Sequence, residues 1–294
     1  MFHRPTLNHL ANLRGLLLCA ASLLPAAAVH AQQPAPRNAL AIAMVSLPGG
    51  SFSMGSCLVR PERDVFLGRA CANPDHDAKM NETPQRTVAV APFQIAKAEV
   101  TLRQFKQYIV ANGRESLVDA EFMRHNNQGD SAPVVRVSWS DAQDFVRWLN
   151  QVDGGGWRLP TEAEWEYACR AGTTSRFCVA ASAEATNAWM ADNSGGRQHP
   201  VALSLPNAWG LHDMSGNAWE WVQDCWADSY AAAPTDGSAV QGQGGCSARV
   251  LREGTDVTLL AYGPMVKTCL QAAQAAAEEG RSLEVIDLRS LSPL

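Results

Sequence analysis

Cysteine is the residue type in this chain with the widest chemical range, because a thiolate can bind a metal, attack a substrate or form a disulfide. The chain has eight cysteines. Two of them, Cys19 and Cys269, stand alone, and the others form sequence-local couples: Cys57 with Cys71, Cys169 with Cys178, and Cys225 with Cys246. We interpret the couples as disulfides that close short loops, although six cysteines allow many other pairings.

A copper or zinc thiolate site is the alternative use of these cysteines. Such a site needs ligands at short spacing, as in a C-x-x-C pair or a cluster of cysteine and histidine. The chain has no C-x-x-C pair, and the histidines beyond residue 31 are isolated ones without H-x-x-x-H spacing: His76, His125, His199 and His212. We therefore expect neither a copper site nor an iron site.

The first 31 residues have the features of an export signal. Arg4 and Arg14 precede a mostly apolar run, Leu16 to Leu24, and small residues end at Ala31 in an A-x-A-like cleavage pattern. The run is shorter than the ~20 residues of a membrane-spanning helix. We expect a signal peptide over 1–31, a linker over 32–42, no stable membrane anchor after cleavage, and a periplasmic or secreted protein in which disulfides persist.

Composition limits the classes of fold and partner. Hydrophobic residues make up 46% of the chain, which argues against disorder. The net charge is −5 and basic residues nowhere run together, so we expect no nucleic-acid partner but an unidentified protein or peptide ligand. All nine tryptophans lie between Trp139 and Trp226, which marks one domain with a tryptophan-rich core.

Three segments carry the signature of a helix start, a hydroxyl residue three positions before Gln or Glu. They are Thr101 to Gln104, Ser140 to Gln143 and Thr161 to Glu164. Ile42 to Met54 is predicted to form a hairpin about a Pro-Gly-Gly turn. From Thr173 to Gly245, frequent Gly, Asn, Ser, Asp and Pro indicate turns and irregular loops.

Four sequence blocks in order resemble the formylglycine-generating enzyme, or sulfatase-modifying factor, family over residues about 43–250. They are Phe52 to Gly55, Pro133 to Trp139, Trp157 to Glu166, and Gly210 to Trp221. The resemblance implies an α+β fold of the C-type lectin-like type, with few regular elements, long loops and structural calcium.

The resemblance also implies two groups of calcium ligands, which in proteins are carboxylate and carbonyl oxygens on flexible loops. The first group is Asn187, Ala188, Asn193 and Gly195, where Asn193 stands in place of a carboxylate. The second is Asp213, Gly216, Ala218 and Glu220. The alternative is that these Asp, Asn and Gly residues only form turns.

The catalytic pattern of the family is incomplete here. Members that oxidise a target cysteine to formylglycine resemble one another in a copper-binding Cys pair shortly after R-V-x-R-G-G-S-W. In this chain Arg249 to Arg252 begin the pattern, but Glu253 to Asp256 follow and Cys269 stands alone. We therefore expect no catalytic residue and a binding or structural module. The alternative is a damaged copy of the oxygen-dependent oxidase.

The tail, residues 251–294, has a different character. From Arg252 onward it resembles the start of the transketolase C-terminal domain in the beta subunit of the 2-oxo acid dehydrogenase first component. Its pattern predicts a single βαβ fragment, with strands at Thr258 to Ala261 and Leu283 to Leu288 around a helix from Met265 to Ala277.

This tail leaves the lectin-like domain incomplete at its C-terminus. The diphosphate-binding residues of that dehydrogenase class lie in its other domain, so we expect no thiamin diphosphate. Our hypothesis is that two unrelated coding sequences are joined near Arg252, and the alternative is a natural fusion. A dehydrogenase-component fragment is the third functional reading.

Overall fold

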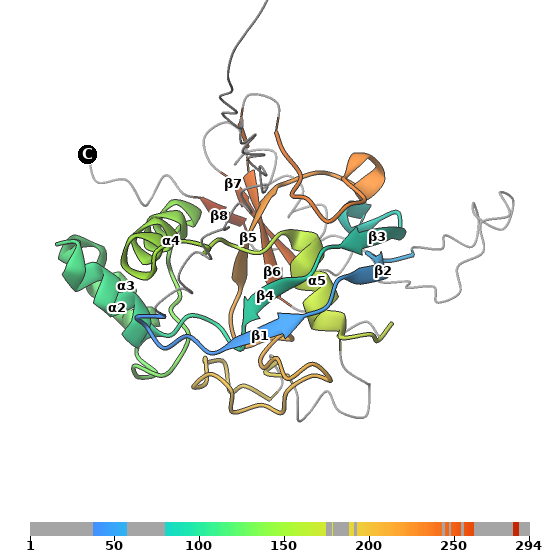
Figure 1. Cartoon of the computed structure of the whole chain (residues 1–294). Helices are drawn as coiled ribbons and strands as arrows, with labels where there is room; N and C mark the ends of the chain where they lie inside the picture. Colours follow the sequence, from blue (N-terminus) through green and yellow to red (C-terminus); the bar gives the residue numbers. More distant parts are fainter. Residues whose placement is uncertain are drawn as a thin grey trace, which may run out of the picture. The chain divides into compact units, whose positions relative to one another are not determined.

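The computed structural model describes residues 38–57, 80–174, 178, 188–190, 193–242, 245–246, 248–253, 256–261 and 285–287. Within them lie four α-helices: α2 (Leu102–Ala111), α3 (Ala120–His125), α4 (Trp139–Asp153) and α5 (Glu162–Arg170). The strands are β1 (Met44–Leu47), β2 (Gly50–Met54), β3 (Arg86–Val90), β4 (Phe93–Ala96), β5 (Glu220–Cys225), β6 (Ala248–Glu253), β7 (Asp256–Ala261) and β8 (Val285–Asp287). The expected signal peptide lies outside the described residues. The fold is a mixture of α and β elements (Figure 1).

The hairpin predicted for Ile42 to Met54 is wrong. β1 pairs antiparallel with β4, and β2 pairs antiparallel with β3, so the two strands belong to two separate ribbons. The chain passes between the ribbons at Gly49, where a Cβ atom would lie 2.7 Å from the carbonyl oxygen of Val90. The Pro-Gly-Gly segment is therefore a crossing point, and only contacts distant in sequence reveal the partners.

Two of the three predicted helix starts are confirmed. Thr101 and Thr161 cap α2 and α5, each within a complete capping box. The third start is wrong by two residues, because Ser138 rather than Ser140 caps α4 and is paired with Asp141. This start places Trp139 in the first turn, where its indole N–H donates to the carbonyl of Val222 at 2.9 Å. The chain offers two serines as possible caps, and the helix begins at the earlier one, Ser138, where Trp139 can contact Val222.

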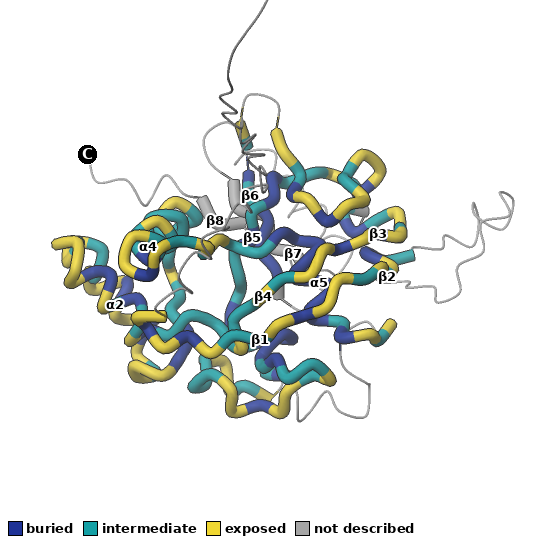
Figure 2. Tube along the Cα trace, in the orientation of Figure 1, coloured by how far each residue is buried: buried dark blue, intermediate teal, exposed yellow. Residues whose placement is uncertain are grey.

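The core is divided into clusters around different helices. α2, α3 and α4 pack their aromatic and aliphatic side chains together with Leu40 and Ile42. α5 contributes Trp165, which is 1% exposed, to a cluster that includes Leu211, Val222 and Val250. Every residue of α5 from Glu162 to Cys169 is buried (Figure 2). The helix thus carries its acidic side chains into the interior.

The last strands form one four-stranded sheet in the order β5-β6-β7-β8. β5, β6 and β7 pair antiparallel, whereas β7 and β8 pair parallel. Two strands of the tail thus occur close to the predicted positions, and β7 extends the sheet that β5 and β6 begin. The helix expected from Met265 to Ala277 lies outside the described residues, so the βαβ unit stays a prediction.

Two of the predicted disulfides are confirmed. Cys169 is bonded to Cys178 and Cys225 to Cys246, with Cα atoms 5.4 and 5.1 Å apart. Cys71 lies outside the described residues, so its pairing with Cys57 stays a prediction. The described part of the chain has no helix with the length and apolarity to cross a bilayer.

Candidate functional site

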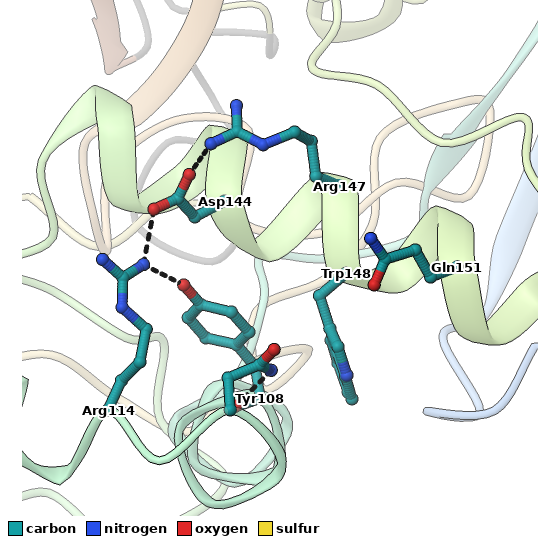
Figure 3. Close-up of a pocket in the computed structure, with 7 residues that line it drawn as sticks. Tyr108, Arg114, Asp144, Arg147, Trp148 and Gln151 are labelled. Atoms are coloured by element: carbon teal, nitrogen blue, oxygen red, sulfur yellow. Dashed lines mark hydrogen bonds and ion pairs between the residues drawn. The ribbon is translucent and has the colours of Figure 1, made fainter.

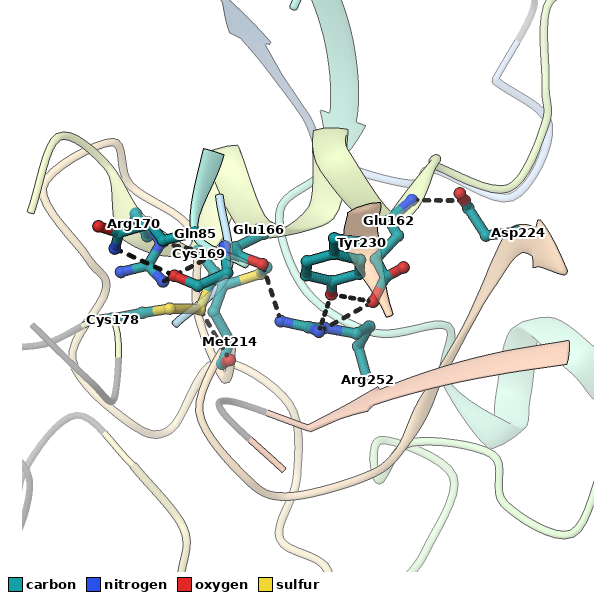
Figure 4. A network of polar contacts seen from close by, with 11 residues as sticks. Gln85, Glu162, Glu166, Cys169, Arg170, Cys178, Met214, Asp224, Tyr230 and Arg252 are labelled. Carbon is teal, nitrogen blue, oxygen red and sulfur yellow. Dashed lines mark hydrogen bonds and ion pairs between the residues drawn. A yellow bond between two sulfur atoms is a disulfide. The ribbon is translucent and has the colours of Figure 1, made fainter. Parts of the chain in front are cut away.

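A buried ionic network joins α5 to strand β6 of the four-stranded sheet. The guanidinium of Arg252, at the end of β6, contacts Glu162 Oε1 at 3.0 Å and Glu166 Oε2 at 3.2 Å. Tyr230 donates its hydroxyl proton to Glu162 Oε1 at 2.7 Å. Arg252 is 4% exposed, so these contacts form away from solvent (Figure 4).

Glu166 connects this network to a second arginine and to the N-terminal ribbons. Its Oε1 atom lies 2.7 Å from Arg170 and accepts the backbone N–H of Gly55 at 2.8 Å. Glu162 and Glu166 are four residues apart and therefore lie on one face of α5. Buried acids on one helical face are stabilised in their charged form by a buried cation. The four-residue spacing of Glu162 and Glu166 is the signal in the sequence that points to this network.

Asp224 on β5 extends the network at the start of α5. Its carboxylate accepts the backbone N–H groups of Glu162 and Val240, each at 2.7 Å. Burial, followed by the nearby charge of Glu162, raises the pKa of Asp224 to about 7. Burial also raises the pKa of Glu162, against the opposing effect of Arg252.

A second acidic cluster contains two of the predicted calcium ligands, Asp213 and Glu220, together with Glu99. Burial and then the charges of Glu220 and Asp213 raise the pKa of Glu99 well above its usual value. Burial is also the largest cause that raises the pKa of Glu220 to about 7. Among the described residues, no lysine or arginine forms an ion pair with these acids.

Hydrogen bonds satisfy only some of the carboxylate oxygens in this cluster. Asp213 accepts the backbone N–H of Ala202 at 2.6 Å and the hydroxyl of Ser204 at 2.5 Å. The amide of Asn217 donates to Glu99 Oε1 at 2.9 Å, whereas Glu99 Oε2 is buried without a hydrogen-bond partner. Glu99 was missed in the sequence, because a single acid next to a helix cap carries no pattern of its own.

The structure brings the two predicted calcium groups next to each other. Trp189, beside Ala188, forms an isolated bridge with Gly216 of the second group. A Cβ atom at Gly216 would lie 2.0 Å from the carbonyl oxygen of Trp189, so this close approach requires glycine. Asn217 strengthens the junction by accepting the backbone N–H of His199 at 2.8 Å.

In the first predicted calcium group, the side chain of Asn193 forms hydrogen bonds with neighbouring backbone groups. The Asn193 amide donates to the Ala188 carbonyl at 2.9 Å, and its oxygen accepts the N–H of Met190 at 2.7 Å. Gly195 follows in an exposed turn with φ of 64°. Asn187 lies outside the described residues.

In the part of the chain that the structure describes, no group of three or more His, Cys, Asp or Glu side chains is arranged to hold a metal ion. A site there would need backbone carbonyl oxygens among its ligands. Cys57, Cys169, Cys178, Cys225 and Cys246 are disulfide-bonded. Where the catalytic pattern of the resemblance begins, the Arg249 guanidinium lies over the ring of Trp139, 3.7 Å from its centroid.

Comparisons with known proteins show which family this chain resembles. The family model described as "Sulfatase-modifying factor enzyme 1-like domain" matches residues 29–285. The formylglycine-generating enzyme of Streptomyces coelicolor is 32% identical in an alignment 287 positions long, and the aligned segments cover 79% of this chain and 83% of the relative. The inactive C-alpha-formylglycine-generating enzyme 2 of Bos taurus is 28% identical in an alignment 258 positions long, with coverages of 70% of this chain and 77% of the relative.

A solved structure has the same fold. The structure of PvdO from Pseudomonas aeruginosa matches with a TM-score of 0.60 and 29% sequence identity, over 74% of this chain and 88% of that one.

The ionic network generates a stability test. Replacing Arg252 with Met leaves Glu162 and Glu166 without their shared cation, so we expect the free energy of unfolding to fall by about 3–5 kcal/mol in urea titrations. Adding E162Q and E166Q should recover part of the loss. The control, R249M on the same strand, removes a cation–π contact with Trp139 and a hydrogen bond to the Gln223 carbonyl, and should cost less, about 1–2 kcal/mol. Equal losses in R252M and R249M would contradict the assigned role.

Asp224 generates a test of pH dependence. Because its pKa rises from 3.8 to about 7 on folding, the folded chain keeps a proton that the unfolded chain releases across this interval. The contribution of Asp224 to stability should therefore fall as the pH rises from about 4 to about 7. The measurement is the difference in unfolding free energy between wild type and D224N at several pH values. D130N, an exposed control whose carboxyl pKa is lowered by Lys106, should show no such fall.

Proposed function

This chain belongs to the sulfatase-modifying factor family, and we propose that it is an exported, calcium-stabilised member that lacks cysteine-oxidising chemistry and acts as a binding or structural module. The observation that carries the proposal is the state of its cysteines. After Arg252 the sequence has a single cysteine, Cys269, and the described cysteines form disulfides. Neither the segment after Arg252 nor the described cysteines therefore offer two free thiolates for a copper(I) site.

Similarity to a relative named as inactive supports this proposal. The bovine protein called inactive C-alpha-formylglycine-generating enzyme 2 covers 70% of this chain. The scaffold of the family is thus compatible with loss of activity. The ligand that we propose for this chain is a protein or peptide, because neither nucleic-acid nor membrane binding has a sequence feature to support it.

Calcium is proposed at the group formed by Asp213, Gly216, Ala218 and Glu220. A buried cluster of acids without an arginine or lysine partner among the described residues costs free energy that a divalent cation would offset. The carboxylates of Asp213 and Glu220 and the carbonyls of Gly216 and Ala218 supply the oxygen ligands that calcium prefers. In both groups an ion would compete with hydrogen bonds, which are those on Asp213 and the Gly216 carbonyl here and the one between Asn193 and Ala188 at the other group.

Export is supported by the disulfides. The bonds Cys169–Cys178 and Cys225–Cys246 fit a protein outside the reducing cytoplasm. The predicted signal peptide over 1–31 would supply the route to the periplasm or the medium.

The second candidate function is a damaged copy of the oxidase. The four family blocks precede Arg252, whereas the family model matches residues 29–285 and so extends past it. The second candidate is an active ancestor whose final segment was exchanged for the tail. Independent long reads across codon 252 of the genomic DNA test this. A continuation into Gly-Gly-Ser-Trp would restore the oxidase pattern, whereas the tail as given supports the joined chain. Neither history gives thiamin diphosphate a complete binding domain.

The main proposal is tested by a peptide assay. The purified chain, incubated in air with copper and a cysteine-bearing sulfatase peptide, should yield no aldehyde by mass spectrometry. The formylglycine-generating enzyme of Streptomyces coelicolor is the positive control. Conversion of the peptide by this chain would overturn the proposal.

Calcium binding is tested by thermal unfolding. Removal of calcium with EGTA should lower the unfolding midpoint, because ligand at a hundredfold excess over its Kd stabilises by about 2.7 kcal/mol. Glu220→Gln should abolish the response, and Asn193→Ala, at the other group, should preserve it. An unfolding midpoint that is insensitive to EGTA in the wild type would refute the calcium assignment.

A further inference from the structure

Two neighbouring hollows lie beside α2 and α4, and none of the acids of the proposed calcium site lines them. The first has a volume of about 310 Å³ and is lined by Tyr108, Arg114, Asp144, Arg147 and Trp148, among others (Figure 3). The second, of about 550 Å³, is lined by Arg103, Lys106, Val110, Asp130 and Trp148, among others. Trp148 lines both, so we treat them as one surface and name it the α2–α4 groove.

The α2–α4 groove is basic on a chain whose net charge is −5. It contains four cations, Arg103, Lys106, Arg114 and Arg147, against two acids, Asp130 and Asp144. A local excess of one sign attracts ligands of the opposite sign. The groove therefore favours an anionic ligand, although the chain as a whole would repel one.

The arginines of the groove keep donors for such a ligand. Arg114 and Arg147 share the single carboxylate of Asp144, with Arg114 Nη1 at 2.5 Å from Oδ2 and Arg147 on the other oxygen. Arg114 also donates to the Tyr108 hydroxyl from the same Nη1 atom. The other two guanidinium nitrogens of Arg114, Nε and Nη2, form no hydrogen bond with the described residues. A guanidinium has five N–H donors, so both arginines can bind a further carboxylate.

An apolar strip accompanies the charges. Val110 is 71% exposed on α2, between Lys106 and Arg114 in sequence. Trp148 is held by ring contacts with Tyr108 and Phe145, at centroid distances of 5.7 and 6.0 Å. A fixed aromatic ring beside an exposed aliphatic side chain gives a ligand apolar surface to cover.

We propose that the α2–α4 groove binds an acidic peptide segment of a partner protein, with its carboxylates on Arg114 and Arg147 and an apolar side chain on Val110 and Trp148. This inference rests on the proposed function, because it names the ligand class of the binding module. Long anionic polymers fit less well, since Asp130 and Asp144 interrupt the basic residues.

The experiment measures fluorescence anisotropy of a labelled ten-residue peptide, rich in Glu and Asp with a central Leu, on the full exported chain. The peptide should bind with a Kd below about 1 mM, and a matched peptide with Lys in place of each acid should not bind. V110E and V110K should shift the Kd by about three- to fivefold in opposite directions, weaker for Glu and tighter for Lys. Both substitutions are on an exposed helical position, so neither should disturb folding.

A double variant identifies the arginines. R114Q with R147Q should weaken binding about tenfold or more. R124Q with R197Q removes the same charge from exposed positions outside the groove and should leave the Kd unchanged. Equal effects of both pairs, shifts of the same sign in V110E and V110K, or tighter binding of a heparin hexasaccharide than of the peptide would each overturn the inference. The aldehyde assay reports on the proposed function separately, because it does not depend on this groove.

Discussion

The buried charge of Arg252 is the constraint on which the domain depends. A guanidinium removed from solvent must meet anions at close range, and here they come from α5 through Glu162 and Glu166. Glu162 also accepts a hydrogen bond from the hydroxyl of Tyr230, and Glu166 accepts one from the backbone N–H of Gly55. The residue that follows β2, the helix α5 and the strand β6 are thereby held together. Such a network adds little stability compared with an apolar core. Removing one of its partners is costly, however, because the remaining charge is then buried without a counter-ion.

The two acidic clusters of the domain differ in how their charge is balanced. Glu162 and Glu166 have Arg252 and Arg170 within reach. Glu99, Asp213 and Glu220 have no such partner among the described residues, and Glu99 keeps a buried oxygen without a hydrogen bond. An internal arginine explains the first cluster, and we attribute the second to an external cation. Neither cluster involves a thiol, so the charge balance of both is independent of the cysteines.

The sequence predicted those features whose signals are local. The capping boxes at Thr101 and Thr161 and the short-range disulfides were recognised because each depends on residues that are near in the chain. The hairpin at Ile42 to Met54 failed because strand partners depend on contacts across dozens of residues. Glu99 is a single acid with no pattern around it, and Arg252 meets Glu162 and Glu166 across 90 and 86 positions of the chain. In the α2–α4 groove, Arg114 and Asp144 lie 30 residues apart, and only the packing of two helices brings them together.

We propose that structural calcium stabilises this domain and that the chain holds no oxidase copper. The decisive measurement is metal analysis of the full-length protein, purified without chelators and then dialysed against metal-free buffer. We expect calcium in roughly equal amount to the chain, as for a site of buried carboxylates and carbonyls, and only traces of copper. Copper in an amount comparable to the chain, or the absence of calcium, would contradict this proposal.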